Sequence, residues 1–189
     1  MKSTATEQSI RALVLAPSKE LCHQIHGNLS DLSIYCTRDI KVINIASQGD
    51  PNAIRSILAE KPDVVVATPT KMLSHLQAKS LDLKESLEIL VVDEADLIFS
   101  FGYESDLRQL VGYLPTVYQA VLASATLSDD VLTLKKLVLH SPVVLKLQEP
   151  MIPPVSQLTH YVVRVENIFF SQVIDIVLEM YNFNDFFGL

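Results

Sequence analysis

The stretch LEILVVDEAD, residues 87–96, places three acidic residues directly after a run of apolar, mostly β-branched residues. A short apolar run of this kind is typical of a strand that is buried on both faces of a sheet. Charged groups at the end of such a strand cost free energy unless other groups pair with them. Asp93, Glu94 and Asp96 therefore indicate a site that uses negative charge.

Similar apolar runs recur along the chain and alternate with helix-like segments. The strand-like runs are residues 12–17, 40–46, 63–69, 87–96, 119–126 and 142–147. The helix-like segments are residues 19–32, 52–60, 70–77, 104–114 and 128–139. Alternation of this kind predicts an α/β fold, a three-layer structure whose mostly parallel sheet has helices on both faces.

Composition restricts the class of protein further. With 189 residues, of which 49% are hydrophobic and 20% charged, the chain can bury one substantial core. A net charge of -7 argues against coating nucleic acid or an anionic membrane by bulk charge, so a nucleic-acid site must be local. No apolar run approaches the roughly 18 residues of a membrane span, and we expect no membrane partner. Cys22 and Cys36 form no metal-binding or disulfide pattern.

The acidic residues after the fourth strand are candidates for metal and water chemistry. In a parallel sheet, the loops at the carboxyl ends of the strands form the ligand crevice. Asp93 suits Mg²⁺ on a nucleotide phosphate, as a ligand either directly or through water. Glu94 could orient or deprotonate an attacking water. A single acid at this position is also a common helix N-cap, but the full tetrad 93–96 favours the chemical interpretation.

Small hydroxyl residues close the next strand, at Ser124, Ala125 and Thr126. Hydroxyls at that end can bond acids on a neighbouring strand without filling the crevice. A plain turn before the helix near Asp129 explains the same residues equally well.

Two strand-to-helix junctions each combine a hydroxyl, a proline and a lysine. Free N–H groups at a helix N-terminus bind phosphates, and lysine adds to their charge. A proline-started, capped helix with no ligand is the alternative at both junctions. The residues concerned are Pro17, Ser18, Lys19 and Glu20 at the first junction and Thr68, Pro69, Thr70 and Lys71 at the second.

In order along the chain, PSKEL (17–21), PDVVVATPTK (62–71), LVVDEAD (90–96), FGYE (101–104) and SAT (124–126) resemble the first RecA-like domain of DEAD-box RNA helicases. The resemblance covers about residues 10 to 150. It implies a P-loop NTPase fold, with ATP and Mg²⁺ as cofactors. It also implies roles in Mg²⁺-ATP hydrolysis for Asp93, which would hold Mg²⁺ through water, and for Glu94.

The same resemblance assigns the remaining candidates. Asp96 would bond toward Ser124 and Thr126 and link hydrolysis to strand separation. The two helix N-termini would grip the RNA backbone without reading its sequence. Within the family, residues 90–104, 114–126 and 139–149 are most similar to the nucleolar helicases of large ribosomal subunit assembly. Pre-ribosomal particles as partners and a nuclear, nucleolar location follow from that similarity.

The chain departs from the family pattern at several contact positions. Ser18 and Lys19 stand where the family commonly has Thr and Arg, and Thr70 and Lys71 where it has Gly and Arg. Lysine keeps the charge but lacks the bidentate fork of arginine. Residues 47–50, SQGD, replace a common Gly-Gly pair, which weakens the case for an RNA contact there.

The phosphate-loop motif G-x-x-x-x-G-K-[ST] does not occur in the sequence. About ten residues precede the first strand, whereas a phosphate-loop strand and helix need roughly 30. We therefore expect residues 1–147 to form a partial N-terminal RecA-like domain, 148–157 a proline-containing linker, and 158–189 the start of a truncated second RecA-like domain. The family's strand order then leaves residues 119–123 either at an open edge or paired with residues 143–147.

Three functional interpretations follow. The chain belongs to an ATP-dependent RNA helicase and is inactive alone, or it is a noncatalytic RNA- or protein-binding fragment. The missing phosphate loop is the feature that separates these two. An unrelated flavodoxin-like or receiver-type fold would use Asp93 for Mg²⁺, but it would need an acid pair after the first strand, which the sequence lacks.

Overall fold

The computed structural model describes residues 9–47, 51–126, 128–139 and 141–145. All the elements below belong to the first of two compact units, Met1–Val143. The predicted linker, 148–157, and the predicted second-domain segment, 158–189, lie outside the described residues. Among the described residues, no helix is both long enough and apolar enough to cross a membrane.

The sheet contains five strands, all parallel, in the order β2-β3-β1-β4-β5. The strands are β1 (Ala12–Leu15), β2 (Val42–Asn44), β3 (Val64–Ala67), β4 (Ile89–Val92) and β5 (Gln119–Leu122). In register, Leu15 lies opposite both Ala67 and Val92, and Val92 lies opposite Leu122. Four strands therefore end at one level, and the polar residues that follow them emerge along the same edge.

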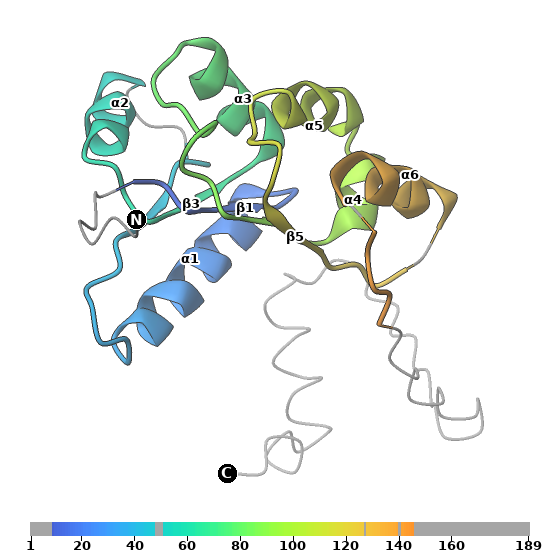
Figure 1. Ribbon diagram of the computed structural model, residues 1–189, viewed down its shortest axis with the longest axis horizontal. Coiled ribbons are helices and arrows are strands. Elements are labelled where there is room, and N and C mark those ends of the chain that lie inside the picture. Colours follow the sequence, from blue (N-terminus) through green and yellow to red (C-terminus); the bar gives the residue numbers. More distant parts are fainter. Residues whose placement is uncertain (1–8, 48–50, 127, 140, 146–189) are drawn as a thin grey trace, which may run out of the picture. The chain divides into compact units, whose positions relative to one another are not determined.

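Helices cover both faces of the sheet, as Figure 1 shows. They are α1 (Lys19–Ser33), α2 (Pro51–Ala59), α3 (Pro69–Gln77), α4 (Ala95–Ser100), α5 (Glu104–Val111) and α6 (Asp129–Val138). Alternate residues of β1 point into different buried clusters, because side chains alternate along a strand. Val14 packs with Cys22 of α1, whereas Leu13 and Leu15 pack with residues of the other helices. The predicted three-layer α/β fold is confirmed.

Several predicted boundaries were wrong. Within the run 87–96, the strand covers only Ile89–Val92, so Asp93 directly follows it as expected. Ala95–Ser100 forms a separate helix that the sequence did not predict. The described part of the predicted sixth strand, 142–145, forms no strand. Pro142 cannot donate a ladder hydrogen bond, and Val143 and Leu145 are 86% and 87% exposed, so this segment lacks the burial that favours a strand.

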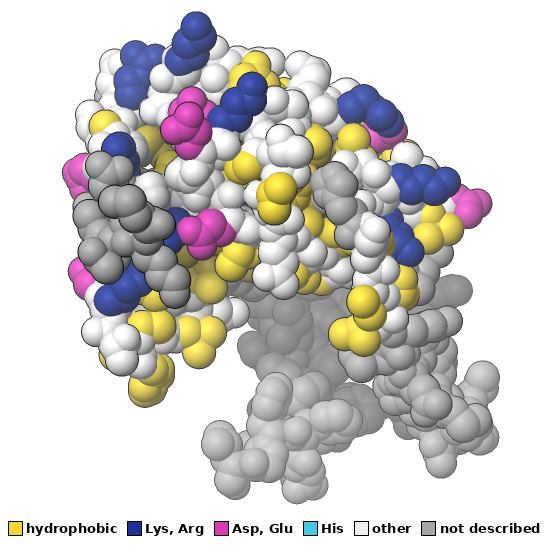
Figure 2. Space-filling view, viewed as in Figure 1, with side chains coloured by type: hydrophobic (Ala, Val, Ile, Leu, Met, Phe, Trp, Pro, Cys, Tyr) yellow, Lys and Arg dark blue, Asp and Glu magenta, His cyan; other side chains and the backbone are white. Residues whose placement is uncertain are grey.

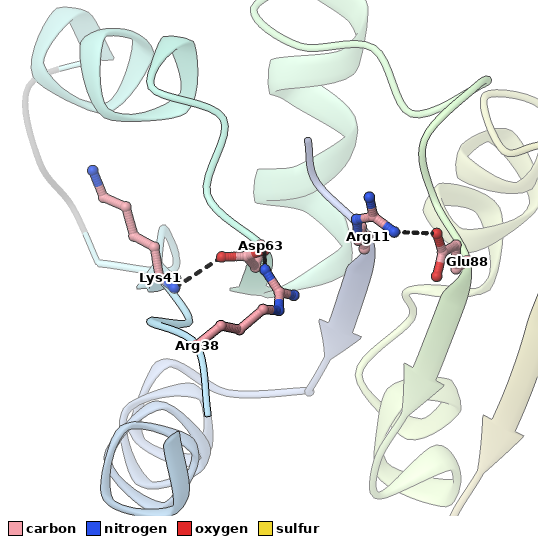
Figure 3. A network of polar contacts seen from close by, with 5 residues as sticks. All are labelled: Arg11, Arg38, Lys41, Asp63 and Glu88. Atoms are coloured by element: carbon pink, nitrogen blue, oxygen red, sulfur yellow. Dashed lines mark hydrogen bonds and ion pairs between the residues drawn. The ribbon is translucent and has the colours of Figure 1, made fainter. Parts of the chain in front are cut away.

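Charged pairs fix the amino ends of the strands (Figure 3). Asp63, which is buried just before β3, accepts hydrogen bonds from the guanidinium of Arg38 at 2.8 Å and from the backbone N–H of Lys41 at 3.0 Å. Arg11 pairs with Glu88 at 2.7 Å across the starts of β1 and β4. A buried carboxylate is tolerated when its oxygens are bonded in this way. These pairs therefore support the register from the end opposite the polar edge.

Among the described residues, β5 is an edge strand, which is the first of the two arrangements expected for it. Gln119 donates to the carbonyl of Glu88 at 2.8 Å and Ala123 to that of Val92 at 2.9 Å. Because successive N–H groups of a strand point in opposite directions, those of Ala120 and Leu122 face the open side. Val121 is 46% exposed, so the sheet face beneath β5 is also partly uncovered.

Amide exchange should detect this open edge. We expect the amides of Ala120 and Leu122 to exchange at least about tenfold faster than those of Leu90 and Val92, because an unpaired N–H needs no opening of the sheet. Exchange followed by NMR on the full chain measures each amide separately. Equal protection at all four amides would mean that another segment or a second molecule pairs with β5.

Candidate active site

The backbone around Glu94 is held on both sides by the neighbouring strands. The N–H of Asp93 donates to Leu15 of β1 at 2.9 Å, and the N–H of Ala95 donates to Ala123 beyond β5 at 3.0 Å. Between these two fixed amides, Glu94 adopts a left-handed conformation with φ 48° and ψ 54°. For a residue other than glycine this conformation costs roughly 1–2 kcal/mol. Such strain is common at functional positions.

The Asp93 carboxylate has free capacity for a ligand. It is half-buried at the end of β4, and its Oδ1 accepts the N–H of Glu94 at 3.0 Å. Among the described residues, neither Asp93 nor Glu94 takes part in an ion pair. Carboxylate oxygens are ligands that Mg²⁺ prefers, and Mg²⁺ usually keeps several waters and substrate phosphates as its other ligands. Asp93 therefore fits a Mg²⁺ ion that a nucleotide brings with it.

Described His, Cys, Asp and Glu side chains form no group of three that could hold a metal ion. Asp93 would thus act as a single protein carboxylate.

Asp96 is tied to the loop after β5. Its Oδ2 accepts a hydrogen bond from the Thr126 hydroxyl at 3.0 Å, and its Oδ1 accepts the N–H of Leu97 at 3.1 Å. Desolvation acts to raise the pKa of Asp96, but hydrogen bonds from the Thr126 and Ser124 hydroxyls and from the Leu97 N–H together lower it. Asp96 is therefore ionised at neutral pH and serves as an acceptor.

The SAT residues form a turn as well as a contact with Asp96. Ser124 Oγ accepts the N–H of Thr126 at 3.4 Å, which shapes the chain after β5. Ala125 is exposed, and no side-chain bond is expected of it. The alternative of a plain turn and the expected contact with an acid are thus both realised, by different atoms of the same residues.

The N-terminus of α1 is capped by its own sequence. Ser18 Oγ accepts the N–H of Leu21 at 3.1 Å, which is the ordinary N-cap bond. Pro17 is buried, and Lys19 and Glu20 are exposed with opposite charges. At this junction, the capped-helix alternative describes the hydroxyl correctly.

The N-terminus of α3 is different. Thr68 is buried and makes no side-chain cap bond, and Pro69, also buried, has no N–H to satisfy. Thr70 is exposed and hydrogen-bonds the Asp106 carboxylate of α5. Because no side chain caps it, the first turn of α3 is the better of the two candidate phosphate sites. Lys71, half-buried on the same turn, adds a positive charge.

The structure thus joins Asp96 to Thr126 by a hydrogen bond, with Ser124 in the same turn, and it places the other candidates separately along the same edge. Figure 2 shows acidic and basic side chains interspersed on the face in view, so the charge there is mixed. Sequence reasoning missed two participants, the carbonyl of Ala123 and the carboxylate of Asp106. Neither has a motif, because one acts through its backbone and the other lies in the first turn of an ordinary helix.

Comparison with known proteins defines the class. The family model described as "DEAD/DEAH box helicase" matches residues 2–134. A DEAD-box protein of the hyperthermophile Methanococcus jannaschii has a similar fold, with a TM-score of 0.64 and 25% identity over 69% of this chain and 35% of that one. The yeast splicing factor Prp28 gives a TM-score of 0.63 and 27% identity over 68% of this chain and 31% of that one. The chain belongs to the DEAD/DEAH-box helicase family.

Individual relatives are similar over the same region. "Probable ATP-dependent RNA helicase ddx56" of Dictyostelium discoideum is 40% identical over 78% of this chain and 22% of its own length. "ATP-dependent RNA helicase DBP9" of Cryptococcus neoformans is 42% identical over 78% of this chain and 24% of its own length. The chain therefore spans about a quarter of the length of these relatives.

The contact between Asp96 and Thr126 makes a titration prediction. Thr126→Val removes the hydroxyl with little change in volume, so the pKa of Asp96 should rise toward its ordinary value of 3.8. Because the pKa is lowered in the folded state, the stability it adds is present above that value and is lost as the pH falls through the lowered pKa. The carboxyl carbon of Asp96, followed by NMR between pH 2 and 6, reports this directly.

Ser128→Ala is the matched control, because Ser128 lies in the same loop but caps α6 through Val131. That variant should leave the Asp96 titration unchanged. An unaltered Asp96 titration in Thr126→Val would contradict the assignment.

Proposed function

We propose that this chain supplies residues for ATP hydrolysis and RNA binding to an ATP-dependent RNA helicase that acts in ribosome biogenesis. The observation that carries the proposal is the hydrogen bond between Thr126 and Asp96, which joins the loop after β5 to the acids after β4. Both ends of this bond lie in motifs that the chain shares with the DEAD-box family. A purely structural turn after β5 would not require an ionised partner in the helix that follows β4.

Asp93 and Glu94 would have different roles in ATP hydrolysis. Bound Mg²⁺-ATP would supply the phosphoryl group and the cation that neutralises its charge. Asp93 would hold the Mg²⁺ through water with its unused carboxylate oxygen. Glu94 would orient the attacking water and accept its proton, from a backbone position fixed by the amides of Asp93 and Ala95.

Coupling to RNA would run through the neighbouring strand. Asp96 lies in the first turn of α4, next to the two catalytic acids, and Thr126 lies in the loop that leads to α6. A displacement of the acids on hydrolysis would therefore be transmitted to the loop after β5 through one hydrogen bond and through the Ala95–Ala123 backbone bond. Through this connection, hydrolysis would be linked to strand separation.

RNA would be held by its backbone. The uncapped first turn of α3 offers N–H groups and Lys71, and the first turn of α1 adds Lys19. Such contacts recognise phosphates and sugars, so binding would be independent of sequence.

Assignment to ribosome biogenesis rests on the similarity of residues 90–104, 114–126 and 139–149 to the nucleolar helicases of large-subunit assembly. Pre-ribosomal particles would be the partners, and the nucleolus the location.

A noncatalytic role is the second candidate, and the absence of a phosphate-loop motif from the 189 residues favours it. In that case the chain would bind RNA or protein through the same edge without turning over ATP. The two candidates differ in whether a phosphate loop is supplied by other residues of a larger polypeptide.

The 189-residue chain by itself should not hydrolyse ATP, because Asp93 and Glu94 act only on phosphates that a phosphate loop already holds. We expect no RNA-stimulated phosphate release when the pure chain is incubated with Mg²⁺-ATP and RNA. RNA-stimulated release that disappears in Glu94→Gln would show that the chain assembles a phosphate site of its own.

RNA binding should be weak, salt-sensitive and indifferent to sequence. Lys19→Ala combined with Lys71→Ala should reduce affinity for single-stranded RNA and lower the slope of log affinity against log salt by about one to two, because each lost phosphate contact removes roughly 0.7 of a released counterion. Fluorescence anisotropy with labelled RNAs at several salt concentrations measures both quantities. Tight binding that survives the double substitution would place the RNA elsewhere.

A further inference from the structure

A carboxylate from another helix is hydrogen-bonded to the first turn of α3. The hydroxyl of Thr70 donates a hydrogen bond to Oδ2 of Asp106, which lies in the first turn of α5. This is a contact between residues 36 positions apart, so it is built by the tertiary fold and not by the local sequence. It places a carboxylate oxygen on a donor of the turn that offers its N–H groups to phosphate.

Among the described residues, no cation forms an ion pair with Asp106. The four ion pairs among the described residues include Glu104 with Arg108 on the same helix, but none includes Asp106 or Lys71. Arg108 is therefore engaged by Glu104 at 2.7 Å. The Asp106 carboxylate thus has the Thr70 hydroxyl as a bonded donor and, among the described residues, no ion-pair partner.

Packing holds Asp106 in this position. Met72 and Leu76 of α3 belong to the same buried cluster as Leu107 and Leu110 of α5. About two turns further along α3 and one turn further along α5, the side-chain amide of Gln77 donates to Gln109 at 3.4 Å. Because α3 and α5 are joined at both ends of their contact, Asp106 cannot move far from the first turn of α3 without a change in its side-chain rotamer.

We propose that Asp106 is an affinity-setting residue of the RNA site, whose carboxylate occupies the phosphate position on the first turn of α3 until RNA displaces it. This inference rests on the proposed RNA-binding function. Carboxylate and phosphate oxygens compete for one hydroxyl donor, and two anions close together repel each other. An RNA phosphate must therefore break the Thr70–Asp106 bond and overcome the charge of Asp106, which lowers affinity and makes release easier.

Asp106→Asn in the full chain tests the proposal, because asparagine keeps the shape and a carbonyl acceptor for Thr70 but removes the charge. We expect affinity for single-stranded RNA to rise by roughly threefold to tenfold at low salt, with the gain shrinking as salt screens the charge. Glu85→Gln is the matched control. It makes the same change in net charge at an exposed position just before β4, at the other end of the sheet, and should leave affinity within error of the parent chain.

The test includes Lys71→Ala, so that failure of the inference and failure of the RNA site can be told apart. Weaker binding in Lys71→Ala together with unchanged or weaker binding in Asp106→Asn would overturn the role of Asp106 alone. No effect of either substitution would overturn the RNA site as well. An equal gain in Asp106→Asn and Glu85→Gln would reduce the effect to bulk charge and also overturn the proposal. Far-UV circular dichroism of each variant confirms that the helices are retained.

Discussion

The site depends on the register of the parallel strands, which makes four of them end at paired positions. Leu15, Ala67, Val92 and Leu122 stand at equivalent heights, so the residues that follow them leave the sheet along one edge. If β4 slipped by one residue, every side chain on it would point to the opposite face, and Asp96 would no longer meet Thr126. The carboxylate of Asp63 and the Arg11–Glu88 pair support the same register from the other end.

This register also explains the strained backbone at Glu94. Parallel pairing to β1 fixes the N–H of Asp93, and pairing to the chain beyond β5 fixes that of Ala95. The residue between them must turn the chain from strand to helix within one position, and the left-handed conformation does so. The cost of roughly 1–2 kcal/mol is offset by the hydrogen bonds on either side. The Glu94 side chain thereby gains a direction that an unstrained strand or helix would not provide.

The fold could be predicted largely from periodicity, because apolar runs and amphipathic segments report burial directly. Boundaries were less predictable where a local rule competed with the fold. The acids were expected to follow the fourth strand, and they do, but the sequence did not predict that the backbone turns at Glu94 and continues as α4. Residues 142–145 have strand-like composition, but Val143 and Leu145 are exposed, so composition alone could not decide their state.

Within the site, side chains with a motif could be placed from the sequence, and those whose role depends on tertiary contact could not. Asp96 and Thr126 were paired in advance because the family pattern includes both. The same reasoning treated the N-termini of α1 and α3 as equivalent, although only Ser18 caps its own helix. The difference arises because Thr70 faces Asp106 across the contact between α3 and α5, which no local pattern encodes.

The difference between the two helix N-termini affects how a chain with a net charge of -7 would bind a polyanion such as RNA. A helix N-terminus that keeps its N–H groups free attracts any anion, including nucleotides and phosphate ions. Ser18 caps the N-terminus of α1, and Asp106 lies beside the N-terminus of α3. Both features reduce this unselective attraction of anions. In the proposed RNA site, a polynucleotide would overcome the repulsion because it makes several phosphate contacts at once, whereas a single phosphate makes one. Weak individual contacts of this kind suit an RNA strand that must be bound and released repeatedly.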